Sequence, residues 1–136
     1  KFFGLAGLRT GIMLGPADLC RRLNDHLGPW AMSHPARAVT QQALEDGAWQ
    51  TRTRARLARD SAALADLLER HGLPVAGRTD FFCWCPTTNA DTIATALARQ
   101  GILVRTFTDP PALRLGLPGE APAWEQLDKA LARVAM

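Results

Sequence analysis

The first half of the chain carries apolar residues at helical spacing. Leucines four positions apart predict a helix that begins just after Pro16 and is stopped by Gly28. Ser33 then supplies an N-cap, followed by a first-turn proline, for a second helix that we expect from Ala36 to about Asp46. The short apolar run 12–14, in front of both helices, predicts a strand.

A long segment without glycine or proline follows at residues 48–70. Its large apolar side chains fall on one face and most of its arginines fall elsewhere, which predicts one long amphipathic helix. Gly72 is a C-cap for this helix, and Pro74 prevents its continuation. Residues 48–74 are therefore interpreted as a long interdomain helix.

The periodicity becomes strand-like after Pro74. A helix capped by Asn89 or Asp91 and a closing amphipathic helix are expected among three strands. The strands are predicted at residues 79–85, 102–107 and 112–117. This order of strand, helix, strand, strand, helix predicts a small α/β domain over residues 75–136.

The expected elements in residues 1–47, one strand and two helices, are too few to close a sheet. We interpret this stretch as the C-terminal remnant of a larger domain. The predicted fold class is therefore α/β, with the end of a large domain, a long linking helix and a small C-terminal α/β domain. On this interpretation the chain is part of a longer polypeptide.

The composition fits an ordinary folded domain whose arginines suit either anionic partners or a solvated surface. The 136 residues are 47% hydrophobic and carry a net charge of +3, mostly from arginine, whose planar fork suits carboxylate and phosphate groups. No run approaches the roughly 20 apolar residues that span a bilayer. Three cysteines form no disulfide framework, so a reduced, cytoplasmic protein is expected. Cys83 and Cys85 share one face of a predicted strand, which indicates core packing and no metal site.

The most informative string opens the chain: Lys1-Phe2-Phe3-Gly4-Leu5-Ala6-Gly7-Leu8-Arg9-Thr10-Gly11. Eight extended residues between Lys1 and Arg9 would span roughly 26 Å. The chain must loop back if both side chains are to reach one small molecule, and Gly4 and Gly7 allow such a loop.

This string resembles the cofactor-lysine segment of the fold-type I pyridoxal 5'-phosphate (PLP) enzymes, the aspartate-aminotransferase superfamily. The resemblance implies that Lys1 binds the cofactor covalently, as the catalytic lysine, and that Arg9 binds the cofactor phosphate. Near the C-terminus, Arg114 in Leu113-Arg114-Leu115-Gly116 matches the arginine that binds the substrate α-carboxylate in this family. Arg105 corresponds to a position that contacts a second anionic group in phosphate-handling members.

Within the superfamily, the segments 29–36, 101–107 and 113–119 resemble the threonine-phosphate decarboxylases of cobalamin biosynthesis. These lyases convert L-threonine O-3-phosphate to aminopropanol phosphate, so a phosphorylated amino acid is the expected small-molecule substrate. Histidinol-phosphate aminotransferases share the same skeleton and are the alternative. The sequence leaves decarboxylation and transamination open.

The family's phosphate-cradling loop, stacking aromatic residue and pyridine-binding Asp have no counterpart in these 136 residues, and the chain has no tyrosine. We expect no turnover from this stretch alone. We expect a homodimer, or completion by an upstream polypeptide, with no nucleic-acid or membrane partner. The rival hypothesis of another class is a non-catalytic anion- or RNA-binding α/β module, which leaves the string from Lys1 to Gly11 unexplained.

Overall fold

The structure is a computed structural model that describes residues 2–134. The chain divides into two compact units, one up to Thr51 and the other from Arg52 onward, and each unit is described by itself. The N-terminal unit contains the short 3-10 turn η1 (Ala6–Leu8), α1 (Ala17–Leu27), α2 (His34–Glu45) and the start of α3 (Gly47–Arg70).

The helix boundaries of the N-terminal unit follow the sequence signals. α1 begins after Pro16 and ends at Gly28, whose φ is +71°, a value that disfavours side chains with a Cβ. Ser33 caps α2, because its hydroxyl accepts a hydrogen bond of 3.3 Å from the Ala36 amide. Asp46 separates α2 from α3 and caps the second of them, since its carboxylate accepts a 2.8 Å bond from the Trp49 amide.

The strand expected at residues 12–14 is wrong, because this run has no regular secondary structure and belongs to no sheet. A strand is stabilised by backbone hydrogen bonds to a neighbouring strand. Among residues 2–51 the structure describes no other strand that could pair with it.

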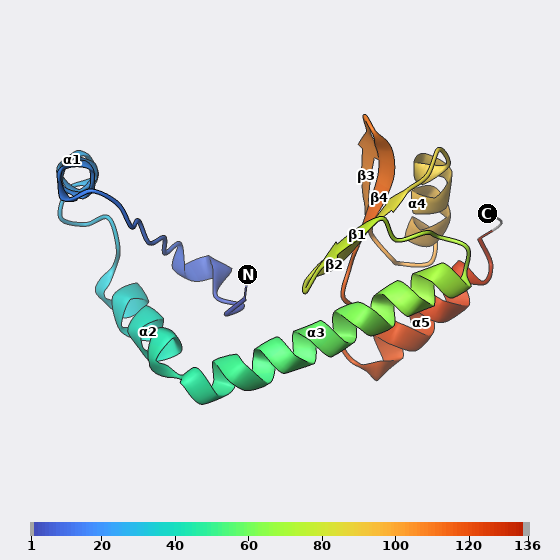
Figure 1. Ribbon diagram of the computed structural model, residues 1–136, viewed down its shortest axis with the longest axis horizontal. Helices are drawn as coiled ribbons and strands as arrows, with labels where there is room; N and C mark the ends of the chain where they lie inside the picture. Colours follow the sequence, from blue (N-terminus) through green and yellow to red (C-terminus); the bar gives the residue numbers. More distant parts are fainter. Residues whose placement is uncertain (1, 135–136) are drawn as a thin grey trace. The chain divides into compact units, whose positions relative to one another are not determined.

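The C-terminal unit is built on a four-stranded sheet with the strand order β1-β2-β4-β3, antiparallel throughout. The strands are β1 (Gly77–Thr79), β2 (Phe82–Pro86), β3 (Arg105–Thr108) and β4 (Pro111–Gly116), and the further helices are α4 (Ala90–Ala98) and α5 (Ala121–Leu131). In this unit α4 lies beside the sheet and α5 runs along α3 (Figure 1). The mixed α/β class is confirmed.

Two strand boundaries differ from those expected. The segment 79–85 is a hairpin and not a single strand, because Asp80 and Phe81 form a two-residue turn between Thr79 and its partner Phe82. The Thr79 hydroxyl supports this turn by accepting a 3.2 Å bond from the Phe81 amide. The strand expected at 102–107 begins only at Arg105, where pairing with β4 starts.

The core lies on one face of the sheet. Cys83 and Cys85 of β2 and Leu113 and Leu115 of β4 are buried there. The helices contribute Leu64, Leu67 and Leu68 from α3, Ile93 and Leu97 from α4, and Leu127 and Leu131 from α5. The core therefore covers one side of the sheet, and the alternate side chains of each strand project from the other side.

Candidate functional site

The predicted site residues fall into both units. Arg9 lies in the N-terminal unit, and Arg105 and Arg114 lie in the C-terminal unit. Lys1 lies outside the described residues. The structure brings Arg105 and Arg114 together as direct cross-strand partners of β3 and β4.

The residues that follow Lys1 pack against the start of α3. Phe3 stacks on Trp49, with ring centroids 5.7 Å apart and planes at 15°, and the Phe2 ring meets Trp49 edge-on at 5.3 Å. Aromatic pairs prefer these offset and edge-on arrangements. Trp49 lies 46 positions after Phe3 in the sequence, so this cluster fixes the opening segment on the helix that follows α2.

Arg9 has an unusual backbone conformation. The segment turns sharply at Gly4, with φ +68°, forms the 3-10 turn η1, and then places Arg9 at φ 52° and ψ 34°. Arg9 is the only non-glycine residue among residues 2–134 with a positive φ. The left-handed conformation costs a residue with a Cβ about 1–2 kcal/mol, and such strain clusters at ligand-binding positions. The loop inferred from Gly4 is therefore present, and it turns the chain at Arg9.

A cavity of about 600 Å³ opens beside this loop. Its polar lining comes from Arg9, Thr10 and Thr40, and the rest is mostly apolar. The Thr40 hydroxyl donates a 3.1 Å hydrogen bond to the Thr10 hydroxyl. This bond ties the residue next to Arg9 to the middle of α2.

The lining of the cavity fits a phosphorylated cofactor. It contains one guanidinium, two hydroxyl groups and no carboxylate. The Arg9 guanidinium and the Thr10 hydroxyl, whose oxygen accepts the Thr40 proton, are suitable donors to phosphate oxygens. The absence of an acidic neighbour in this lining leaves the guanidinium charge available to an anion. Thr10 and Thr40 were missed by the sequence reasoning, because only the fold brings residue 40 next to residue 10.

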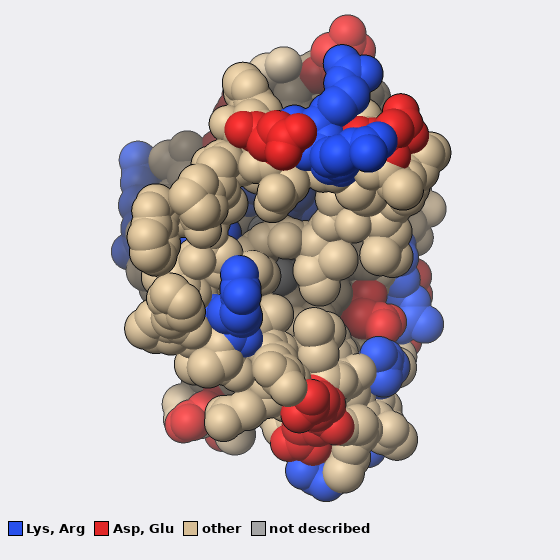
Figure 2. All heavy atoms as spheres, turned by 90° about the vertical axis from the view of Figure 1, so that its left-hand side faces the viewer, with Lys and Arg blue, Asp and Glu red and all other residues tan. Residues whose placement is uncertain are grey.

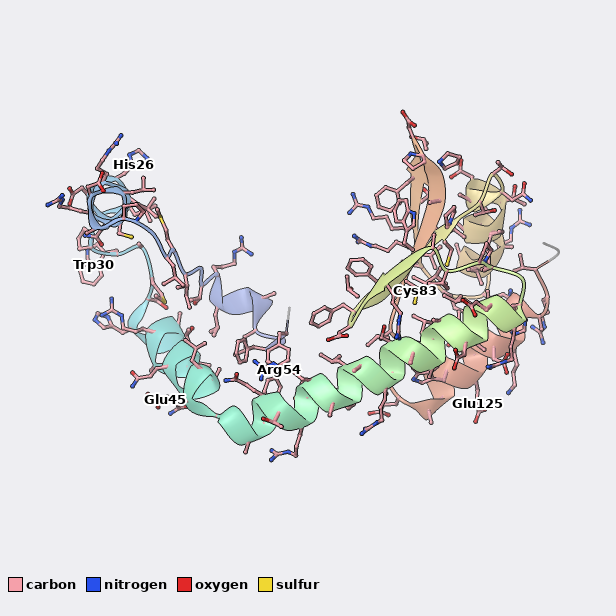
Figure 3. The ribbon with its side chains drawn as sticks, in the orientation of Figure 1. His26, Trp30, Glu45, Arg54, Cys83 and Glu125 are labelled. Atoms are coloured by element: carbon pink, nitrogen blue, oxygen red, sulfur yellow. The ribbon has the colours of Figure 1, made fainter. Side chains whose placement is uncertain are left out.

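The second group of residues lies on the sheet face that α3, α4 and α5 leave uncovered, here called the outer face. It consists of Phe82, Trp84, Arg105, Phe107, Ala112 and Arg114, which alternate with the core residues of β2 and β4 and with the half-buried Thr106 of β3. Aromatic side chains and side chains that end in nitrogen atoms project from the side of the sheet away from α4 (Figure 3). The outer face is therefore aromatic and basic.

Arg114 lies between two aromatic rings on this face. Its Cζ is 4.8 Å from the centroid of Phe82 on one flanking strand and 5.9 Å from that of Phe107 on the other. The Arg105 Cζ is 5.2 Å from the same Phe107 ring. The ion pairs found among the described residues do not include either arginine. Both guanidinium groups therefore retain donors for an anionic ligand.

The aromatic residues of the outer face were also missed. Spacing of two residues predicts that Phe82 and Trp84 share a face, and likewise Arg105 and Phe107. The sequence does not show that β4 inserts between β2 and β3, and this strand order decides which rings meet the guanidinium of Arg114.

The two strand cysteines pack in the core, as expected. Both Cys83 and Cys85 are fully buried on the face opposite the arginines. Burial raises the pKa of the Cys85 thiol to about 12, and the neighbouring Cys83 adds to this effect. These thiols are therefore protonated near neutral pH and are poor nucleophiles and metal ligands. Among residues 2–134 no cluster of His, Cys, Asp and Glu has the geometry of a metal site.

Comparisons with known proteins identify relatives over most of the chain. The chain is 46% identical over 131 residues to a threonine-phosphate decarboxylase of Pseudomonas aeruginosa, an alignment that covers 96% of this chain and 40% of the relative. A threonine-phosphate decarboxylase of a Sinorhizobium species is 36% identical over all of this chain and 40% of its own length. A histidinol-phosphate aminotransferase of Rhodopseudomonas palustris is 34% identical over 85% of this chain and 34% of its own length.

The fold has a solved counterpart. A Burkholderia pseudomallei protein, provisionally assigned as an aminotransferase, superposes with a TM-score of 0.85 at 24% identity, covering 97% of this chain and 42% of that protein. The chain spans about 40% of the length of the two threonine-phosphate decarboxylases that it matches. Within residues 2–134, none of the helices combines the length and the hydropathy of a membrane-spanning segment. The family model for aminotransferase class I and II matches residues 1–134, and the chain therefore belongs to the class I and II aminotransferases, a PLP-dependent family.

Proposed function

We propose that this chain is the C-terminal part of a PLP-dependent decarboxylase that converts O-phosphothreonine to aminopropanol phosphate. The observation that carries the proposal is the 46% identity, over nearly the whole chain, to a threonine-phosphate decarboxylase. The chain spans about 40% of that relative, so the complete site needs the rest of the length, and this chain alone has no turnover.

The N-terminal unit holds the cofactor in this proposal. Lys1 binds it covalently, Arg9 binds its phosphate, and Thr10 lies next to that arginine in the same cavity lining. When bound, PLP accepts the electron pair of the bond broken at the substrate Cα. Two observations support this assignment: the hydrogen-bond donors that line the cavity, and the strained left-handed backbone conformation of Arg9.

The C-terminal unit holds the substrate. Arg114 binds the α-carboxylate with its planar fork, and Arg105 binds the phosphate of the same molecule. Their direct cross-strand pairing supports this division. In the reaction the bond from Cα to the carboxylate breaks, carbon dioxide leaves, and a proton takes its place at Cα.

The decisive experiment measures carbon dioxide release. The complete polypeptide, given O-phosphothreonine and PLP, should release carbon dioxide without any oxo-acid acceptor. Borohydride reduction of the same protein should fix PLP to Lys1. Labelling at Lys129, the other lysine of the chain, would contradict the role of Lys1.

The second candidate is a histidinol-phosphate aminotransferase, favoured by the 34% identity to the Rhodopseudomonas palustris protein. It requires 2-oxoglutarate and releases no carbon dioxide. Conversion of histidinol phosphate with 2-oxoglutarate, together with no carbon dioxide from O-phosphothreonine, would establish this alternative in place of the decarboxylase.

We also propose that the N-terminal unit is covered in the working enzyme, by a second copy or by an upstream polypeptide. Of eleven large exposed apolar side chains among the described residues, ten lie between Leu5 and Leu44, and the unit buries only Ala36 fully. A broad, mostly uncharged surface lies between charged upper and lower edges in Figure 2. Exposed apolar areas of this kind drive association. Sedimentation of the chain as a stable 14.8 kDa monomer would contradict this.

The domain assignment is part of the same proposal. Residues 1–47 belong to the PLP-binding large domain, 48–74 form the interdomain helix, and 75–136 form the small domain. The division of the chain into compact units falls after Thr51, inside α3. Limited proteolysis that cuts within residues 75–136 before it cuts near residue 50 would contradict the assignment.

A further inference from the structure

Two guanidinium groups share one aromatic ring on the outer face. Arg105 and Arg114 lie 5.2 Å and 5.9 Å from the centroid of Phe107, whereas only Arg114 lies over Phe82. Phe107 is thus the one ring of this face that contacts both arginines. Phe82 is a similar ring on the same face with a single guanidinium contact, which makes it a matched control.

The shared ring has an electrostatic consequence. Arg105 and Arg114 are directly opposite each other on β3 and β4, and like charges in such positions repel. The ion pairs of the described residues leave both without a carboxylate partner. The negative face of an aromatic ring attracts a guanidinium and occupies none of its hydrogen-bond donors. Phe107 therefore offsets the repulsion while the donors of both arginines stay available.

The position of the Phe107 ring is itself fixed. Its centroid is 4.6 Å from that of Trp84, although β4 lies between the strands of these two residues. The register places the two residues diagonally across β4, where Trp84 pairs with Arg114 and Phe107 pairs with Ala112. Ala112 is small and is completely buried although it belongs to the outer face. A larger side chain at this position would occupy the space of the aromatic contact. Trp84 and Ala112 thereby fix the ring that holds the arginines.

We infer that Phe107 is a positioning residue that holds the Arg105 and Arg114 guanidinium groups side by side, so that the outer face selects ligands with two anionic groups. This inference rests on the proposed function, in which the ligand carries a carboxylate and a phosphate. Phe107 makes no bond to the substrate and acts through the two arginines. Phe82 supports only the arginine assigned to the carboxylate.

The first test uses the complete enzyme and two ligands. O-phosphothreonine carries both anionic groups, and threonine, used as a competitive inhibitor, carries only the carboxylate. Phe107→Leu should raise KM for O-phosphothreonine by about 5- to 30-fold, which corresponds to the loss of one or two guanidinium–ring contacts. The same variant should raise Ki for threonine by a smaller factor. Phe82→Leu should raise both constants by the same factor. Phe107→Tyr, which keeps the ring, should behave as the parent enzyme.

The second test needs no turnover and uses the complete enzyme. The guanidinium NMR signals of both arginines should lose their ring-current shifts in Phe107→Leu, and only that of Arg114 in Phe82→Leu. If Phe107→Leu does not fold, trifluorophenylalanine at position 107 keeps the shape and weakens the negative ring face. This replacement should also raise KM for O-phosphothreonine.

The outcomes separate the inference from the proposed function. Equal factors for both ligands in Phe107→Leu, or unchanged guanidinium signals, overturn the positioning role. A parent enzyme that does not turn over O-phosphothreonine, but whose two arginine signals both shift when this ligand is added, overturns the proposed function and supports the two-anion face.

Discussion

The hydroxyl of Thr40, in the middle of α2, donates a 3.1 Å hydrogen bond to the hydroxyl of Thr10, the residue after Arg9. Both side chains line the cavity to which we assign the cofactor phosphate. Thr40→Val keeps the shape of the side chain and removes the donor. A net hydrogen bond contributes about 0.5–1.5 kcal/mol, so the affinity of the complete enzyme for PLP should fall by roughly 2- to 12-fold.

The control for this variant is Thr51→Val. The Thr51 hydroxyl bonds only to the Gly47 carbonyl of its own helix, and it lies outside the cavity lining. An absorbance titration with PLP measures both variants. Equal loss of affinity in the two would show that the Thr40–Thr10 bond has no special role in the cavity.

Arg114 should be the most sensitive of the substrate-binding positions. Removal of a charge-assisted contact in a desolvated site costs about 2–4 kcal/mol, so Arg114→Ala should lower kcat/KM for O-phosphothreonine by roughly 30- to 1,000-fold. Arg114→Lys should recover little, because an ammonium group cannot reproduce the planar fork. Steady-state carbon dioxide release measures both, and full recovery by lysine would argue against bidentate binding of the carboxylate.

Much of the helical structure was predictable because its signals are local. Gly28 and Gly72 both adopt positive φ, and the capping residue Ser33 bonds as expected. The hairpin turn at Asp80 and Phe81 was missed, since the apolar run 81–85 hides a break that shows only when β1 and β2 pair. The run 12–14 was misassigned because strand formation depends on a partner that local sequence does not reveal.

The site was predictable to a smaller extent. The glycines of the opening string predict the loop between Lys1 and Arg9. The strand pattern near the C-terminus predicts that Arg114 lies on a strand. The Thr10–Thr40 bond and the shared ring of Phe107 join residues that are distant in sequence. Such contacts depend on the packing of α2 and on the order of the strands. These tertiary relationships cannot be obtained from periodicity.

The buried thiol of Cys85 should make stability depend on alkaline pH. Burial raises its pKa from the ordinary value of 9.0 to about 12 in the folded chain. Below pH 9 the thiol is protonated in both states and has no effect on the pH dependence. Above pH 9 the unfolded chain loses its proton first, so the free energy of unfolding falls until the pH reaches about 12. The slope from one such group is at most about 1.4 kcal/mol per pH unit.

Urea denaturation of Cys85→Ala between pH 8 and about 10.5 measures this contribution. The variant should be less stable at pH 8, because a buried side chain is truncated, but its stability should fall less steeply above pH 9. Leu115→Ala is the control, since Leu115 is equally buried on the same sheet face and has no titratable group. It should lower stability at every pH and leave the slope unchanged.

The contact between Trp84 and Phe107 across β4 leads to a prediction about side-chain volume. The two rings are 4.6 Å apart although they come from strands on either side of β4, and Ala112, which pairs with Phe107, is completely buried. Ala112→Leu should force the rings apart and lower the free energy of unfolding by about 1–3 kcal/mol, as overpacking does. The near-ultraviolet circular dichroism of the ring pair should weaken.

Ala112→Gly is the matched comparison at the same position. It adds no side-chain atoms near the rings and costs only about 0.5–1 kcal/mol for the added freedom of the strand backbone. The near-ultraviolet signal should therefore persist in Ala112→Gly and decline in Ala112→Leu. Because the displaced Phe107 ring also contacts Arg105 and Arg114, Ala112→Leu should also weaken binding of O-phosphothreonine, whereas Ala112→Gly should not. If the leucine variant keeps the signal and the affinity of the parent chain, Ala112 has no part in placing the ring.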